Sequence, residues 1–289
     1  MKYIDINGHK CNKESKQDKL LNFMYTTTVG RILLKPLVSP FFSKLAGGLL
    51  NTKFSCRIIE RFIESNGIDM SDFEKAEYSS YNDFFTRRIR PGARTISGNE
   101  YTLISPCDSY VTAYEITDHL TFNVKNTEYT LRSLLHSRRL AGRFDGGHAL
   151  IFRLTVSDYH RYSYAVSGTQ SKNYYIPGTF HTVNPVANDY LPVYKENSRE
   201  YTVIHSEHFG DVLQMEVGAL MVGKIVNHKQ SCPVIRGEEK GYFEFGGSTI
   251  IVLLQKDAVT LRDDLLKNTS AGYETQVKLG DNIGEAPRN

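Results

Sequence analysis

The feature of this sequence that most restricts its fold is a change in hydrophobic pattern near residue 100. Before that point, apolar residues recur at i, i+3 and i+4, as in Asp18–Tyr25 and Arg57–Ile63, which predicts amphipathic helices. After it, short alternating or β-branched runs lie between Gly and Pro residues, which predicts strands joined by turns. These runs are Ser109–Ile116, Ala149–Val156, Tyr201–His205, Val212–Val217 and Thr249–Leu254. One helix is expected among them, at Leu131–Leu140. The sequence therefore predicts an α+β fold, with amino-terminal helices followed by a mainly β catalytic body.

We expect two regions, a helical membrane-associating region over residues 1–75 and a β-rich domain over residues 76–289. The helical region contains ILLKPLVSPFFSKLAGGLL (32–50), which is apolar but interrupted by two prolines and a glycine pair, so short helices are predicted. Residues 1–60 carry ten Lys or Arg against four Asp or Glu. A basic and apolar region suits an anionic membrane surface. A helical layer that only covers a sheet has the same pattern, and both interpretations stay open.

Composition excludes several classes of function. The net charge of +3 is too small to indicate a nucleic-acid partner. No run reaches the roughly 18 apolar residues of a membrane-spanning helix, so any membrane contact is expected to be peripheral. The four cysteines are far apart with no C-x-x-C pair, which predicts neither a metal site nor a disulfide framework. These features together predict a location on the cytoplasmic side of the cell membrane.

The segment KGYFEFGGSTIIVLL (240–254) places a Gly-Gly pair and a Ser-Thr pair directly before a strongly β-forming run. A serine hydroxyl reaches the carbonyl carbon of the preceding residue only through a contorted backbone, which glycine tolerates. The attack needs a base and donors for the developing oxyanion. The resulting ester eliminates to dehydroalanine, which hydrolyses to a pyruvoyl group that takes up electrons when an amino acid loses carbon dioxide. Taken alone, the same residues also fit a glycine bulge before a core strand.

Seven ordered segments favour the first interpretation. They are YNDFFTRRIRPGAR (81–94), SPCDSYV (105–111), FRLTVSDYHRYSY (152–164), GTFHTVNP (178–185), NSREYTV (197–203), VGALMVGKI (217–225) and FGGST (245–249). With these segments the chain resembles the phosphatidylserine decarboxylase proenzymes from about residue 80 to its carboxyl end, while residues 1–75 match only loosely. The resemblance implies a self-processing, pyruvoyl-dependent carboxy-lyase that converts phosphatidylserine to phosphatidylethanolamine and carbon dioxide.

The resemblance also implies roles for individual residues. Ser248 is the expected precursor of the pyruvoyl cofactor, and Gly247 is expected to supply the carbonyl that is cut. Cleavage would give pieces 1–247 and 248–289, which we expect to stay paired. Asp108 matches the acidic member of a serine-protease-like triad, and His160 matches an active-site histidine that moves protons.

One position departs from the family pattern. Many members carry a second histidine three residues after the first, credited as the triad base, and here that position is Ser163. The resemblance then implies that His160 does both jobs or that another imidazole moves in, with His181 as the best substitute. The remaining histidines have weaker claims; they are residues 9, 119, 136, 148, 205, 208 and 228.

Substrate binding is less legible in the sequence. Cations for a lipid phosphate are present in the matched segments; they are Arg161, Arg199, Lys224 and the cluster Arg87, Arg88, Arg90 and Arg94. Two other functions stay open: a pyruvoyl decarboxylase of another amine substrate, and an uncleaved, non-enzymatic lipid-binding relative. The sequence leaves the oligomeric state open, with a homodimer among the alternatives.

Overall fold

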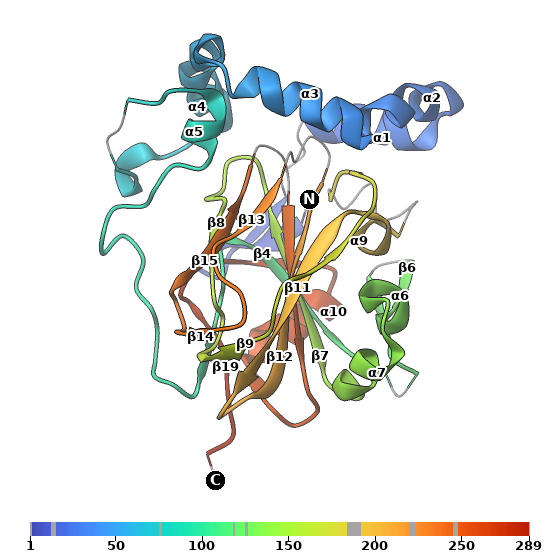
Figure 1. Ribbon diagram of the computed structural model, residues 1–289, viewed down its shortest axis with the longest axis vertical. Coiled ribbons are helices and arrows are strands. Elements are labelled where there is room, and N and C mark those ends of the chain that lie inside the picture. Colours follow the sequence, from blue (N-terminus) through green and yellow to red (C-terminus); the bar gives the residue numbers. More distant parts are fainter. Residues whose placement is uncertain are drawn as a thin grey trace.

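A layer of helices lies across one end of a β-rich body in the computed structural model (Figure 1). The structure describes residues 2–12, 16–74, 77–117, 119–124, 127–183, 192–219, 224–244 and 248–288. The predicted α+β architecture, helices first and strands after, is confirmed. None of the described helices has the length and apolar character that a membrane span requires.

The helical layer consists of short helices joined by tight turns. They are α1 (Lys16–Thr26), α2 (Thr28–Leu37), α3 (Pro40–Leu50), η1 (Lys53–Ile58), α4 (Ile59–Asn66), η2 (Met70–Asp72) and α5 (Tyr81–Phe85). Thr27 caps α2 by accepting a hydrogen bond from the Gly30 N–H, and Gly67, at φ +61°, ends α4. Of the four expected interruptions, only Pro40 coincides with a break; it begins α3, where proline is tolerated in the first turn of a helix. Pro36 lies inside α2, and Gly47 and Gly48 lie inside α3.

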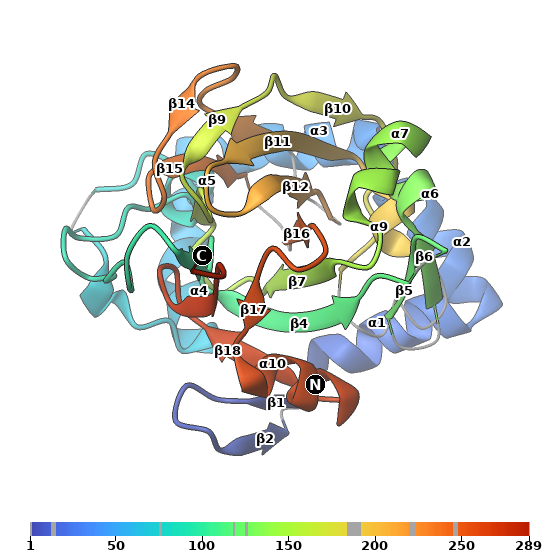
Figure 2. The same cartoon turned by 90° about the horizontal axis from the view of Figure 1, so that it is seen from below.

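The main sheet forms the centre of the body and has eleven strands among the described residues, in the order β14-β9-β11-β12-β16-β7-β4-β18-β1-β2, with β10 beside β11. Its strands are β1 (Lys2–Ile4), β2 (Lys10–Asn12), β4 (Ser109–Glu115), β7 (His148–Leu154), β9 (Gly168–Gln170), β10 (Tyr174–Ile176), β11 (Arg199–Ser206), β12 (Gly210–Val217), β14 (Pro233–Val234), β16 (Ser248–Leu254) and β18 (Glu274–Val277). All five predicted strands are present. The hairpin β1–β2 was not predicted; it precedes the helices but joins the sheet beside β18 (Figure 2).

Strand β16 is the most buried element of the sheet. It pairs antiparallel with β12 on one side and β7 on the other, and all seven of its residues are buried. A strand covered on both faces carries a continuous apolar run instead of an alternating one, which explains the sequence IIVLL.

Smaller elements complete the body. The sheet β13-β15-β8 contains β13 (Ile225–Asn227), β15 (Glu239–Phe243) and β8 (Arg161–Ser163). The others are β3 (Thr102–Ile104), β17 (Thr260–Leu261) and β19 (Asn282–Glu285) in one sheet, β5 (Thr121–Val124) and β6 (Thr127–Thr130) in another, and the helices α6 (Leu131–Leu135), α7 (Arg138–Ala141), η3 (Gly142–Phe144), α9 (Val193–Glu196) and α10 (Asp263–Ser270). The Gln214 side chain of β12 links the main sheet to the β8 segment, since it donates to the Ser163 carbonyl (3.0 Å) and accepts from the Ala165 N–H (3.3 Å).

The single helix predicted over Leu131–Leu140 is wrong in one respect, because the structure has two helices there. His136 adopts a left-handed conformation (φ +51°) that ends α6, and Ser137 caps α7 by accepting from the Leu140 N–H. A left-handed residue followed by a capping serine stops one helix and starts the next.

Candidate active site

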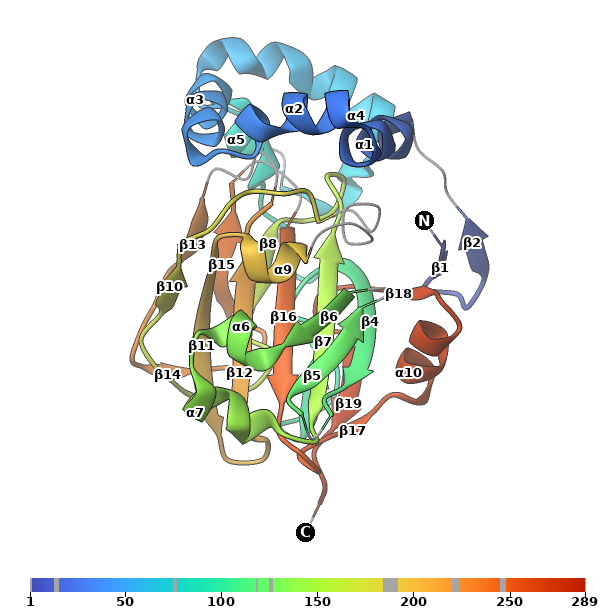
Figure 3. The same cartoon turned by 90° about the vertical axis from the view of Figure 1, so that its right-hand side faces the viewer.

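Four neighbouring strands of the main sheet end or begin at the same edge, directly beneath the helical layer (Figures 1 and 3). Strand β16 begins there at Ser248, which pairs with Leu154 at the end of β7. Val217 at the end of β12 pairs with Thr249, and β4 begins at Ser109. Residues that are far apart in the sequence therefore meet at this edge.

Ser248 is the first residue of β16 and is fully buried. Its Oγ has no hydrogen-bond partner among the described residues. A buried hydroxyl without a partner is costly, so its presence requires a reason other than stability. Gly247, named in the sequence analysis as the donor of the cut carbonyl, lies outside the described residues, as do the other residues at 245–247.

The chain that follows β7 carries His160 into the same edge. His160 is fully buried, its ring centroid lies 4.0 Å from that of Phe85 in α5, and its Nδ1 lies 2.9 Å from the Asp158 carbonyl oxygen. Because a carbonyl only accepts, Nδ1 carries the proton in the neutral ring and the lone pair is on Nε2. The local backbone thus fixes the tautomer that has Nε2 as its base.

Asp158 is a second ionisable group at this edge, and it was not among the predicted site residues. Its Oδ2 accepts from the Thr155 N–H (2.6 Å) and hydroxyl (2.7 Å), and these hydrogen bonds favour the charged carboxylate. The loss of hydration on burial outweighs them, with a smaller contribution from the negative charge of Asp108, and raises the pKa of Asp158 to about 6. The signal available in the sequence was its place in the matched segment, two residues before His160.

Asp108 lies immediately before β4, and its carboxylate forms an ion pair with Arg94. Arg94 Nε donates to Oδ1 (2.9 Å) and Nη2 to Oδ2 (2.5 Å), while the Leu279 N–H also donates to Oδ1 (2.8 Å). Such a bidentate pair holds a carboxylate in a fixed orientation. No hydrogen bond between Asp108 and a histidine is found in the part of the chain that the structure describes.

His181 lies between the helical layer and the sheet edge. Its Nδ1 is 3.3 Å from the Tyr25 hydroxyl of α1, its Nε2 is 4.0 Å from Glu196, and burial lowers its pKa. Asn197 clamps the same segment, because it bonds both the N–H and the carbonyl of His181 and also donates to the Gly218 carbonyl (2.7 Å). Gly218 follows Val217, so this clamp reaches the position beside Ser248 in the sheet register.

The candidate phosphate-binding cations are mostly engaged elsewhere. Arg199 is buried and donates to the carbonyls of Leu134, Lys195 and Asn197. Arg87 is buried over the rings of Phe73 and Phe84. These two arginines support the fold.

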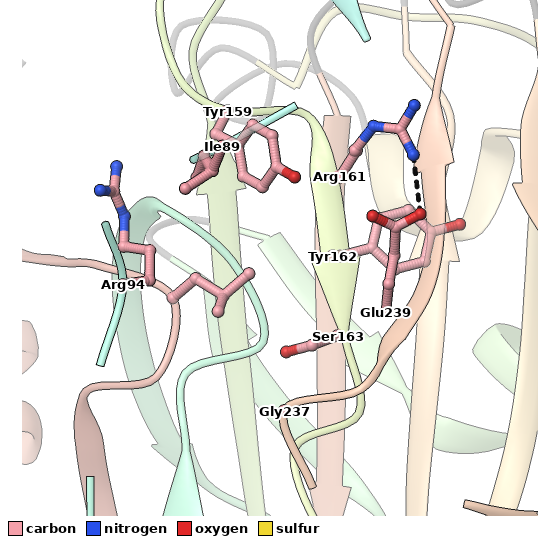
Figure 4. Close-up of a pocket in the computed structure, with 9 residues that line it drawn as sticks. Ile89, Arg94, Tyr159, Arg161, Tyr162, Ser163, Gly237 and Glu239 are labelled. Carbon is pink, nitrogen blue, oxygen red and sulfur yellow. Dashed lines mark hydrogen bonds and ion pairs between the residues drawn. The ribbon is translucent and has the colours of Figure 1, made fainter. Parts of the chain in front are cut away.

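A cavity of about 150 Å³ lies beside Ser163, and Figure 4 shows its lining. Ser163 and Tyr159 line it together with Arg161, which pairs with Glu239 at 2.7 Å. Arg94 also lines it and is the same residue that binds Asp108. The position where the family pattern has a second histidine thus faces a cavity whose cations are already paired.

Comparison with known proteins identifies the family. The family model for phosphatidylserine decarboxylase matches residues 81–285. The chain belongs to the phosphatidylserine decarboxylase family. It is 47% identical to phosphatidylserine decarboxylase proenzyme 2 of Clostridium acetobutylicum over 267 residues, which cover 92% of this chain and 91% of the relative. It is 40% identical to the phosphatidylserine decarboxylase proenzyme of Clostridium tetani over 273 residues, which cover 93% of this chain and 92% of that relative.

These matches confirm the expected activity, a carboxy-lyase acting on phosphatidylserine and made as a proenzyme. The pyruvoyl group that the sequence analysis expected is likewise confirmed for the phosphatidylserine decarboxylase family.

Proposed function

We propose that this chain cuts itself between Gly247 and Ser248 and then decarboxylates phosphatidylserine at the surface of a membrane. The observation that carries the proposal is the Ser248 hydroxyl, which is buried at the start of the central strand and has no hydrogen-bond partner among the described residues. A hydroxyl that no structural acceptor holds is available to a base that activates it, and the glycine pair before it supplies the backbone freedom that the attack needs. A pyruvoyl group formed there would supply a ketone that condenses with the substrate amine and takes up the electron pair released with carbon dioxide.

His160 is the residue we assign to proton transfer at Ser248. Its fixed tautomer has the lone pair on Nε2, and it follows the loop from Leu154, the partner of Ser248 in the sheet. In this assignment His160 does the work of both histidines of the family pattern. His181 instead joins the helical layer to the body, since its ring already contacts Tyr25 and Glu196.

The two carboxylates have different tasks in this proposal. Asp108, held by Arg94 and the Leu279 N–H, supplies a fixed negative charge at the edge. The pKa of Asp158 is raised to about 6, so its carboxyl changes charge near neutral pH, while its backbone carbonyl holds the His160 ring.

The helical region, residues 1–75 in the sequence analysis, is the part we assign to peripheral membrane contact on the cytoplasmic side. Six apolar side chains of α2 and α3 are more than half exposed; they are Val29, Ile32, Leu33, Phe41, Leu45 and Leu49. An apolar patch of this kind on a soluble surface indicates an interaction site. Lys53 and Arg57 of η1 are exposed beside it and suit anionic headgroups.

The decisive experiment is the mass of the purified protein combined with the carbonyl reactivity of its carboxyl-terminal fragment. We expect two fragments, with a reactive carbonyl on the piece 248–289. Ser248→Ala should give one full-length, inactive chain. Thr249→Val is the matched control, because the Thr249 hydroxyl is also buried and unpartnered among the described residues but lies on the opposite face of the strand. A full-length mass for the unmodified protein would instead indicate the uncleaved lipid-binding relative.

A further inference from the structure

A buried cluster of charged and polar side chains lies between the main sheet and the β13-β15-β8 sheet. Lys240 Nζ donates to Glu216 Oε2 and to Asn227 Oδ1, both at 2.7 Å. Asn227 Nδ2 donates in turn to Glu200 Oε1 (2.8 Å) and to Glu216 Oε2 (3.2 Å). The Tyr162 hydroxyl also reaches Asn227 Oδ1, at 3.2 Å.

The two ends of the central ion pair are fully enclosed, since the side chains of Lys240 and Glu216 are 1% and 0% exposed. Only one oxygen of Glu216 is used by this cluster. The other, Oε1, is buried and has no hydrogen-bond partner among the described residues. A carboxylate oxygen that is buried without a hydrogen bond is costly, so a donor that reaches it gains a strong interaction.

The sheet register places Glu216 next to the reactive serine. Glu216 pairs with Ile250 across β12 and β16, and side chains two residues apart on a strand share a face, so Ser248 and Glu216 face the same interior. Ser248 is the diagonal neighbour of Glu216, and diagonal neighbours are about 7–8 Å apart at the backbone, which long side chains span. Two buried oxygens that lack a hydrogen-bond partner in the described parts of the chain thus lie on one face of adjoining strands.

The charges of the cluster do not balance. Glu200 and Glu216 pair directly across β11 and β12, and the cluster contains only one cation, Lys240. Like charges opposite each other destabilise a sheet, and the negative charge of Glu200 adds to the burial that raises the pKa of Glu216. An arrangement with one negative charge in excess favours a cationic donor, and the substrate of this family presents a primary ammonium group to the site.

Resting on the proposed role of Ser248, we propose that Glu216 Oε1 is the acceptor that recognises the amino group of the substrate at the pyruvoyl group formed from Ser248. Lys240 and Asn227 are positioning residues that hold Oε2 and turn Oε1 toward the serine. The ligand class is a primary ammonium, and the site discriminates a cationic amine from a neutral nucleophile.

Two small reagents separate this role from the general accessibility of the pyruvoyl group to reagents. Methylamine with cyanoborohydride tests capture of a cationic amine, and hydroxylamine tests capture of a neutral nucleophile, each measured by the mass of fragment 248–289. Glu216→Gln should slow methylamine attachment about tenfold or more, because a hydrogen bond to a charged group is lost, and leave hydroxylamine attachment within about twofold of the unmodified protein. Equal slowing of both reagents, or no change in either, would overturn the proposal.

A second variant guards against a folding defect, since Glu216→Gln leaves Lys240 buried beside a neutral group. Glu216→Gln with Lys240→Met removes both charges and should show the same selective loss of methylamine capture; recovery of capture in this double variant would mean that the pair is only structural. The matched control is the exposed pair of Lys229 and Glu238, whose replacement by Met and Gln should affect neither reagent. If the unmodified protein reacts with neither reagent, the pyruvoyl group is absent and the proposed function fails along with this inference.

Discussion

At the scale of single residues, the candidate site places groups where they cost stability. Ser248 keeps a hydroxyl dry without a partner among the described residues, and Asp158 keeps a carboxyl where its charged form is disfavoured. Natural proteins accept such costs at functional positions. Replacing either group should therefore make the chain more stable and less active.

Asp158→Asn tests this directly. The pKa of Asp158 is raised from 3.8 to about 6, so the folded state is penalised once the carboxyl is charged, fully above about pH 6 and not at all below about pH 4. In a Ser248→Ala background, where every chain stays whole, urea unfolding should show a gain of about 3 kcal/mol at about pH 8. The gain should disappear at about pH 4, and a gain that is equal at both values would refute the assigned pKa.

The same substitution in the self-cleaving chain should slow fragment formation by about tenfold or more, as for loss of a group that assists proton transfer. In the unmodified chain the cleavage rate should rise with pH through about 6, as Asp158 acquires its charge. Time courses of the full-length mass at several pH values measure both effects. A variant that cleaves at the normal rate would remove Asp158 from the site.

At the scale of elements, α3 shows an exposed stripe. Phe41, Leu45 and Leu49 repeat every four residues, which places them on one helix face, and they are 70%, 54% and 64% exposed. Replacing all three by Ser should reduce binding to vesicles containing phosphatidylserine by about tenfold or more, because their apolar area is lost. Co-sedimentation measures the effect, and Ile235→Ser, on an equally exposed residue of a turn in the body, is the control. Unchanged binding would separate the stripe from membrane contact.

The junction between α1 and α2 depends on Gly30. A Cβ at this position would lie 2.3 Å from the Phe23 carbonyl oxygen and 2.6 Å from Met24 Cα, both backbone atoms that cannot move aside alone. Gly30→Ala should therefore cost about 1–3 kcal/mol and loosen the helical layer toward proteases. Gly48→Ala in α3 meets nothing within 4 Å and should instead add about 0.5–1 kcal/mol through helix propensity. Thermal unfolding and limited proteolysis of both variants check this contrast.

The sequence predicts well those elements whose signal is long and periodic. The five strands of the main sheet and the first helix follow from such runs. The hairpin β1–β2 was missed because its strands have three residues each and are held by β18, some 270 residues away. The break at His136 was missed because a left-handed histidine leaves no apolar gap in the pattern.

The candidate site follows the same rule. Ser248, Asp108 and His160 are found from motifs, and the structure brings their strands and loops to one edge. The partners of each residue could not be read from the sequence, because Arg94 meets Asp108 and Lys240 meets Glu216 only after the sheets have packed. The sequence shows that a residue is charged, but its ion-pair partner is determined by the tertiary packing.

At the scale of the whole molecule, the proposed cut leaves three of the four described strands of the small piece paired with the large one, while the fourth, β17, pairs with β19 within the small piece. Strand β16 lies between β12 and β7, β18 pairs with β4 and with β1, and β19 pairs with β3. Pieces 1–247 and 248–289 should therefore elute together in size exclusion and separate only in denaturant. Separation under native conditions would mean that cleavage dismantles the central sheet.

The helical layer lies directly over the sheet end that holds Ser248 (Figure 3). With α2 and α3 bound to lipid as proposed, a phosphatidylserine headgroup has to pass only the helical layer to reach Ser248. The acyl chains of the lipid can then stay in the leaflet. Turnover would then follow the mole fraction of phosphatidylserine within the bilayer and be indifferent to the total amount of vesicles once all enzyme is bound. Dilution with neutral lipid at constant phosphatidylserine would slow the enzyme, as expected of a catalyst that works in two dimensions.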